Sequence, residues 1–107
     1  MAGLAAVEAT PAGLADGLVH ALDTLAEIES RLGHGDVALT LLDRADAAET
    51  DVGTLGGLAI TRAGALLSLR RWRAAEAAAT RALTQLAADD EINLAWARAL
   101  HGRARWH

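Results

Sequence analysis

Several side chains in this chain of 107 residues are of types that carry out chemistry, but their spacing does not suit it. Asp43, Asp46 and Glu49 recur every third residue, and paired carboxylates can transfer protons when they lie in a dry, shaped pocket. Along one face of an expected helix, such a row is more typical of a solvated surface. We therefore interpret these acids as surface residues and not as an acid–base pair.

The sequence also lacks the motifs that are typical of a catalytic nucleophile, a metal site or a phosphate-binding loop. Ser30 and Ser68 have no nucleophile-elbow context, and the segment 53–57 lacks the lysine of a phosphate-binding loop. The chain has no cysteine, which excludes disulfides and thiolate chemistry. No two histidines are four residues apart, and none stands at metal-ligand spacing from a carboxylate; they are His20, His34, His101 and His107. The sequence predicts no catalytic residue, no cofactor and no metal, so we expect that the protein is not an enzyme.

Arg70-Arg71-Trp72-Arg73 is the sharpest local cluster of charge. Arginine beside an aromatic ring can stack on bases and bind phosphates, so a small regulator that binds nucleic acid is the alternative function. The net charge of −4, the absence of lysine and the acidic first half of the chain argue against it. An arginine-rich turn that meets an acidic protein surface, or is simply solvated, fits the sequence better.

The two halves of the chain carry opposite charge. Residues 1–60 hold ten acidic residues and two arginines, a net charge of −8, whereas residues 61–107 hold four acidic residues and eight arginines, a net charge of +4. Opposite fields at the two ends favour orientation of a partner or head-to-tail self-association, unless they are chance drift in solvated faces.

Composition also bears on origin and compartment. All ten basic residues are arginine, and alanine and glycine are abundant, which indicates a GC-rich, bacterial coding background. No apolar run approaches a membrane span, and the first ten residues lack the basic start of a signal peptide. We expect a cytoplasmic protein without membrane contact.

The chain reads as one all-α domain over residues 11–107, preceded by a flexible N-terminus, 1–10. Thr10-Pro11 is a helix start signal, and Gly33-His34-Gly35 is a stop. We expect five helices, at about 11–32, 37–48, 58–69, 72–87 and 92–105, with a polar, glycine-bearing break at 49–57. An apolar stripe at helical spacing runs along the first helix: Leu14, Leu18, Leu22, Leu25, Ile28 and Leu32.

A shift of 37 residues brings the chain into register with itself. An internal period of this length is typical of a stacked helical repeat, and short connections require antiparallel neighbours. The sequence therefore predicts a right-handed α-solenoid of antiparallel helix hairpins. The matching sets are Leu18, Leu55 and Ile92; Ala26 and Ala63; Leu32 and Leu69; Ala38 and Ala75; Arg44 and Arg81; and Ala45 and Ala82.

The segment 63–83 resembles the tetratricopeptide repeat (TPR). Ala63 matches the small residue of the family's first helix and Leu66 the bulky residue after it, while Trp72 matches the aromatic that starts the second helix. The first copy matches through six residues: Leu22, Leu25, Ala26, Ala38, Leu42 and Ala45.

The resemblance has departures in each copy. Ala79 stands where the second copy needs a bulky residue. Gly35 replaces the aromatic in the first copy, and Glu29 a bulky apolar residue. The third copy begins with Trp96 but ends after one helix, with Leu100 where a small residue is expected. The alternative is an Ala/Leu-rich bundle that shares only its amphipathic period with the family.

The resemblance implies a ligand groove lined by the first helix of each repeat. Its middle would be apolar, with Ile60 and Leu67, unless these two belong to the core. The asparagine and lysine residues with which some family members bind a C-terminal carboxylate are absent. By register, the groove residues are His20, Asp23, Glu27, Ser30, Gly57, Ile60, Gly64, Leu67, Leu94, Ala97, Arg98, His101 and Arg105.

The expected function is protein binding without catalysis. We expect a TPR-like adaptor, or an accessory subunit of a larger bacterial complex, that takes up a helix or peptide segment of its partner or associates with itself. The segment would lie on Ile60, Leu67 and Leu94, with the nearby charged residues selecting its charge: Asp23, Glu27, Arg98 and Arg105.

Overall fold

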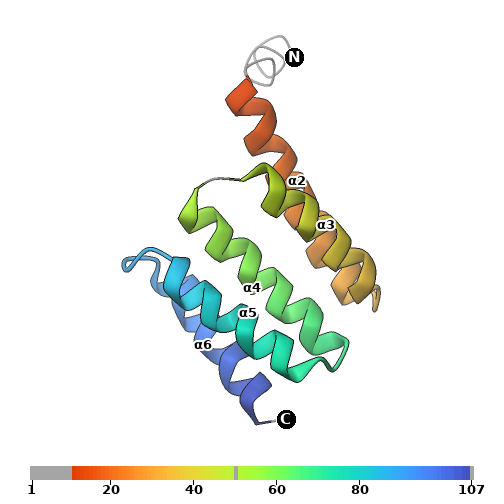
Figure 1. The fold of residues 1–107 in the computed structure, drawn as a ribbon, viewed down its shortest axis with the longest axis vertical. Helices are drawn as coiled ribbons and strands as arrows, with labels where there is room; N and C mark the ends of the chain where they lie inside the picture. Colours follow the sequence, from red (N-terminus) through yellow and green to blue (C-terminus); the bar gives the residue numbers. More distant parts are fainter. Residues whose placement is uncertain (1–10, 50, 107) are drawn as a thin grey trace.

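The computed structural model of the chain describes residues 11–49 and 51–106, and side chains from Gly17 onward. Within these residues it contains helices and no strand: α2 (Pro11–Arg31), α3 (Gly35–Ala48), α4 (Val52–Ser68), α5 (Trp72–Gln85) and α6 (Glu91–Arg105). Successive helices reverse direction along the chain (Figure 1). Over the described residues, the prediction of five helices and no strand is confirmed. The expected flexible segment 1–10, with Thr10, and the terminal His107 lie outside the described residues.

One helix boundary differs clearly from the prediction. Helix α4 begins at Val52 and not at Leu58, so most of the expected break is helical. Asp51 caps this start, because its Oδ2 accepts hydrogen bonds of 2.9 Å from both the amide and the hydroxyl of Thr54. Gly56 is buried in the helix, where an added Cβ would lie 3.0 Å from the backbone nitrogen of Leu86. The glycine is therefore needed for close packing and does not break the helix.

Two turns that lie 37 residues apart have the same backbone conformation. Gly33, after α2, and Arg70, after α4, both adopt positive φ angles, of 86° and 58°. Each turn closes with the same two amide-to-carbonyl hydrogen bonds, which define a Schellman-type helix end. The bonds are His34 N to Glu29 O (2.8 Å), Gly33 N to Ser30 O (3.1 Å), Arg71 N to Leu66 O (2.9 Å) and Arg70 N to Leu67 O (3.0 Å).

Two apolar clusters form the core, one on either side of α4. The first joins α4 to α5 and α6, and the second joins α4 to α2 and α3. Many of the buried side chains are alanines, which let neighbouring helices approach closely. Six of these stand in pairs 37 residues apart and have no solvent exposure: Ala26 and Ala63, Ala38 and Ala75, and Ala45 and Ala82.

The apolar stripe of the first helix is not the side that α2 buries. The buried residues are Val19, Leu22 and Ala26. Of the predicted stripe only Leu22 is among them, and the side chain of Leu14 lies outside the described part. The remaining four residues, which we call the α2 stripe, are 47–65% exposed: Leu18, Leu25, Ile28 and Leu32. Helix α2 contacts α3 and α4 alone among the described helices, and these leave roughly half of the stripe exposed.

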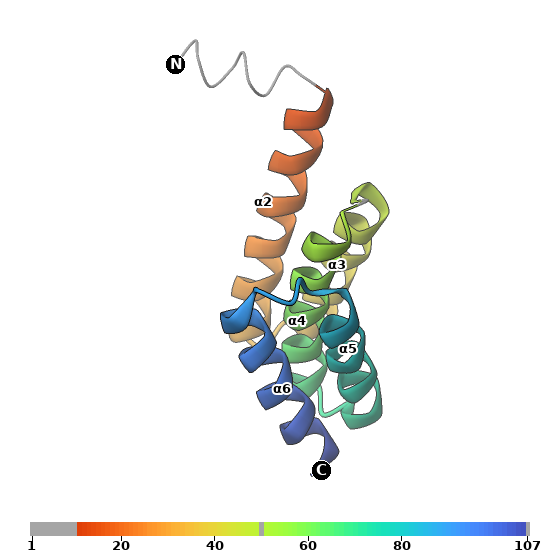
Figure 2. The same cartoon turned by 90° about the vertical axis from the view of Figure 1, so that its left-hand side faces the viewer.

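The helices form two sets around α4. In Figure 2, α3 and α5 lie on one side of α4, whereas α2 and α6 lie on the other. The first turns of α2 extend beyond the other helices in the same view. Residues of α2, α4 and α6 together line a pocket, which lies in a groove between α2 and α6.

Candidate interaction groove

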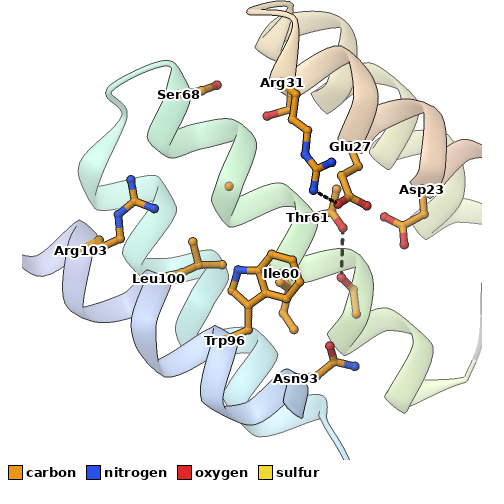
Figure 3. Close-up of a pocket in the computed structure, with 13 residues that line it drawn as sticks. Asp23, Glu27, Arg31, Ile60, Thr61, Ser68, Asn93, Trp96, Leu100 and Arg103 are labelled. Atoms are coloured by element: carbon orange, nitrogen blue, oxygen red, sulfur yellow. Dashed lines mark hydrogen bonds and ion pairs between the residues drawn. The ribbon is translucent and has the colours of Figure 1, made fainter.

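The groove between α2, α4 and α6 holds a pocket of about 480 Å³. All three helices contribute side chains, and Figure 3 shows them on two walls and a floor. Helix α2 supplies Asp23, Glu27, Ser30 and Arg31; α4 supplies Gly57, Ile60, Thr61, Gly64 and Ser68; and α6 supplies Asn93, Trp96, Leu100 and Arg103.

The α2 wall is charged. Arg31 Nη2 lies 2.8 Å from Glu27 Oε1, one turn away on the same helix. This pair is largely exposed and contributes little to stability. Its importance lies in the charged edge that it presents to the groove, next to the carboxyl group of Asp23 (Figure 3).

Asp23 has an unusual environment for an acidic residue. Its Oδ1 atom is buried and has no hydrogen-bond partner among the described residues. Burial raises the pKa of Asp23 above its ordinary value, and the charge of Glu27 adds to this effect, whereas the nearby hydroxyl of Thr61 and His20 oppose it. The Thr61 hydroxyl itself lies 3.4 Å from the carbonyl oxygen of Gly57, to which it donates. Asp23 thus brings to the groove wall a carboxyl group with one oxygen that no described donor satisfies.

The floor of the groove, formed by α4, has two glycines that leave its backbone uncovered. Cβ atoms added to Gly57 and Gly64 would meet no atom within 4 Å. Glycine in the middle of a helix costs about 1 kcal/mol relative to alanine, and no packing constraint requires it at these two positions. Between them, Ile60 is buried at the base of the pocket. The backbone of α4 is thus accessible from the groove.

The α6 wall is largely apolar. Trp96 is 50% exposed and faces the floor near Ile60, with Leu100 beside it (Figure 3). Asn93 and Arg103 lie at the two ends of this wall. The groove therefore combines acidic groups on one wall, an apolar centre and an arginine on the opposite wall.

The predicted groove residues fall into two groups. Six of them line the pocket, namely Asp23, Glu27, Ser30, Gly57, Ile60 and Gly64. His20 lies beside an adjacent hollow that also includes Asp23. The rest lie elsewhere: Leu67 and Ala97 are buried in the core, Leu94 packs against it, His101 Nε2 lies 3.6 Å from Glu76 Oε1 of α5, and Arg98 and Arg105 are exposed outside the pocket.

The difference on α6 concerns the groove and not the core. Helix α6 buries Ala97, Leu100 and Ala104, which are the 37-residue counterparts of three residues that α4 also buries, Ile60, Ala63 and Leu67. Because α6 forms the wall opposite α2, it turns other residues to the pocket than the register predicted: Asn93, Trp96, Leu100 and Arg103. The groove residues that the sequence did not predict are Arg31, Thr61, Ser68, Asn93, Trp96, Leu100 and Arg103.

The row of acids on α3 joins two helices. Arg62 Nη2 of α4 lies 2.9 Å from Asp43 Oδ1 and 2.9 Å from Asp46 Oδ2. Only 18% of the Arg62 side chain is exposed. The expectation of a simply solvated face is wrong for Asp46, which is partly buried in this ion pair. No group of three potential metal ligands occurs in the described part of the chain.

The arginine cluster lies at the turn between α4 and α5. Trp72 is partly buried and packs against the core, so its ring does not form an open stacking surface. Arg71 Nη2 lies 3.3 Å from Asp36 Oδ1 of α3. Arg70 and Arg73 are exposed.

Among the described residues, no helix is long and apolar enough to cross a membrane. Comparison with protein-family models, with curated proteins and with solved structures finds no match to this chain.

Proposed function

We propose that this chain is a non-catalytic protein-interaction module, a TPR-like right-handed α-solenoid that serves as an adaptor or accessory subunit of a larger bacterial complex. The recurrence of the same turn after α2 and α4 supports the repeat architecture. The groove between the first helices of the successive hairpins supports the binding role.

The observation that carries this proposal is the pair of open glycines on the groove floor. Gly57 and Gly64 weaken α4, and neither is required by a neighbouring atom. Glycine is suited to positions where a ligand approaches the backbone closely. A peptide segment of a partner protein that lies along α4 accounts for both positions.

The mechanism follows from the walls of the groove. An apolar side of the partner segment packs on Ile60, Trp96 and Leu100. A hydrogen-bond donor or cation of the segment pairs with Asp23, and an acidic group is placed toward Arg103. Of the residues that the sequence assigned to the apolar contact, Ile60 remains, while the α6 residues replace Leu67 and Leu94.

The test is a peptide-display selection against the purified chain, followed by affinity measurements with the selected peptides. Gly64→Met fills the groove from its floor, and Gly17→Met is the matched control, since an added side chain there also meets open space on a helix. The peptides should lose about tenfold or more in affinity for Gly64→Met and bind Gly17→Met as they bind the parent chain. Equal binding to all three chains would show that the groove is not the binding site.

The same chains allow the nucleic-acid alternative to be measured. Fluorescence anisotropy with single-stranded and duplex DNA at low salt should give no saturable binding, since Trp72 packs against the core and the chain is acidic. Tight, salt-dependent binding that is lost in Arg70→Glu/Arg73→Glu would favour the alternative function.

A further inference from the structure

A second uncovered apolar surface lies on α6. Ile92 is 81% exposed and Trp106 is 88% exposed. Ala99 and Gly102 lie between them on the same side of the helix, and an added Cβ at Gly102 would meet no atom within 4 Å. We call these four residues the α6 stripe.

The α2 stripe and the α6 stripe occupy the same position in the repeat. Leu18, Leu25, Ile28 and Leu32 become Ile92, Ala99, Gly102 and Trp106 after two shifts of 37 residues. A single shift of 37 residues from the α2 stripe leads to four residues in α4 and at its end that pack on α3: Leu55, Arg62, Ala65 and Leu69. Leu69 lies against Gly35, Arg62 binds Asp43 and Asp46, and Leu55 and Ala65 join the cluster with α2 and α3. In α4, therefore, the face that corresponds to the two stripes packs against a neighbouring helix.

We propose that a second copy of this chain packs its α2 stripe onto the α6 stripe. This inference concerns the ends of the molecule and does not depend on the groove.

The two stripes are complementary in shape. The α2 stripe presents four large aliphatic side chains. The α6 stripe has small residues, Ala99 and Gly102, between two large ones. Large side chains that enter a hollow over small residues repeat the relationship of Leu69 and Gly35 inside the chain.

The charges favour a contact between α2 and α6 over a contact between two α2 helices or two α6 helices. The α2–α3 hairpin, residues 11–48, has seven acidic residues and two arginines, a net charge of −5. Helix α6 has three arginines and one glutamate, a net charge of +2. A contact of α2 with α2, or of α6 with α6, brings like charges together, whereas α2 with α6 brings opposite charges together. The contact is heterologous, because the two copies use different faces.

Light scattering across micromolar to millimolar protein tests the proposal. The parent chain should show a mass that rises above the monomer with concentration. Leu25→Arg and Ala99→Arg should each weaken association about tenfold or more, since the first sets a cation against the arginines of α6 and the second fills the hollow. Ala77→Arg, at an exposed position of α5, is the matched control and should associate as the parent does.

Mixing the two variants gives the decisive result. Each retains one intact stripe, so an equimolar mixture of Leu25→Arg and Ala99→Arg should form a one-to-one dimer at concentrations where each variant alone is monomeric. A monomeric parent chain at every concentration would overturn the proposal. So would a loss of association in Leu25→Arg with none in Ala99→Arg, which indicates a symmetric α2 contact. Far-UV circular dichroism checks that each variant remains helical, and Gly64→Met should associate like the parent.

Discussion

Leu69 lies directly over Gly35, so that a Cβ on Gly35 would be 2.6 Å from the Cγ atom of Leu69. This contact joins the end of α4 to the start of α3, and it explains why the first repeat has glycine where the second has Trp72. An aromatic residue at position 35 would collide with the side chain that closes the α3–α4 interface.

We expect Gly35→Ala to destabilise the fold by about 1–3 kcal/mol, because the added methyl group overpacks this contact. Urea denaturation of Gly35→Ala and the parent chain measures this loss of stability. In a Leu69→Ala background the same substitution should cost much less, since the opposing side chain is gone. An equal cost in both backgrounds would place the strain elsewhere.

The turn after α4 contains a residue that is poorly suited to its backbone. Arg70 has a φ angle of 58°, whereas its counterpart in the first turn is Gly33. Arg70→Gly should stabilise the chain by about 0.5–1 kcal/mol, and Gly33→Ala should destabilise it by about 1 kcal/mol. Thermal unfolding of both variants tests the pair. A loss of stability in Arg70→Gly would mean that the arginine side chain contributes more than the backbone strain removes.

Asp23 makes stability depend on pH in a definite direction. Because its folded-state pKa is raised by burial, the unfolded chain releases this proton at lower pH than the folded chain does. Its stabilising contribution is complete below the unfolded pKa and is lost as the pH rises through the folded pKa. Asp23→Asn should therefore be more stable than the parent at neutral pH.

The same comparison in acid is the control for Asp23. Below the ordinary pKa of aspartate, the stabilities of Asp23→Asn and the parent chain should converge. The pKa of Asp51 is lowered by its hydrogen bonds from Thr54, which gives the opposite trend in both chains and cancels in the difference. A difference between the two chains that does not change with pH would show that Asp23 titrates normally.

Arg62 is the main charged link between the two hairpins. Its replacement in Arg62→Met keeps the aliphatic stem but removes the ion pairs with Asp43 and Asp46, and we expect a loss of about 1–2 kcal/mol in unfolding free energy. Arg73→Met, at an exposed position, should change stability by less than about 0.5 kcal/mol. Equal effects of the two substitutions in urea denaturation would contradict a structural role for Arg62.

The sequence predicted the helices well because local signals mark their ends. Pro11 and Gly33 stand at or next to helix boundaries, and each acts through its own backbone geometry. The start of α4 was missed because three glycines near it suggested a loop. The cap at Asp51 and the packing of Gly56 on Leu86 become visible only when the helices are placed together.

The groove could be predicted only in part. On α2 and α4 the 37-residue register placed Asp23, Glu27, Ile60 and Gly64 at the pocket. On α6 the register predicted the buried side but not the residues at the pocket, which are Asn93, Trp96, Leu100 and Arg103. A repeat pattern predicts which faces are equivalent, but α2 and α6 form opposite walls of the groove and so turn different faces to it.

The alanines in the helix crossings also limit how this protein can change over time. Ala26, Ala38, Ala45, Ala63, Ala75 and Ala82 have no exposed surface, and any larger residue there would push two backbones apart. Homologous chains that keep this fold should therefore be nearly invariant at these six positions. Sequence differences between such chains should therefore be found mainly on the groove walls and at the two ends of the helix array.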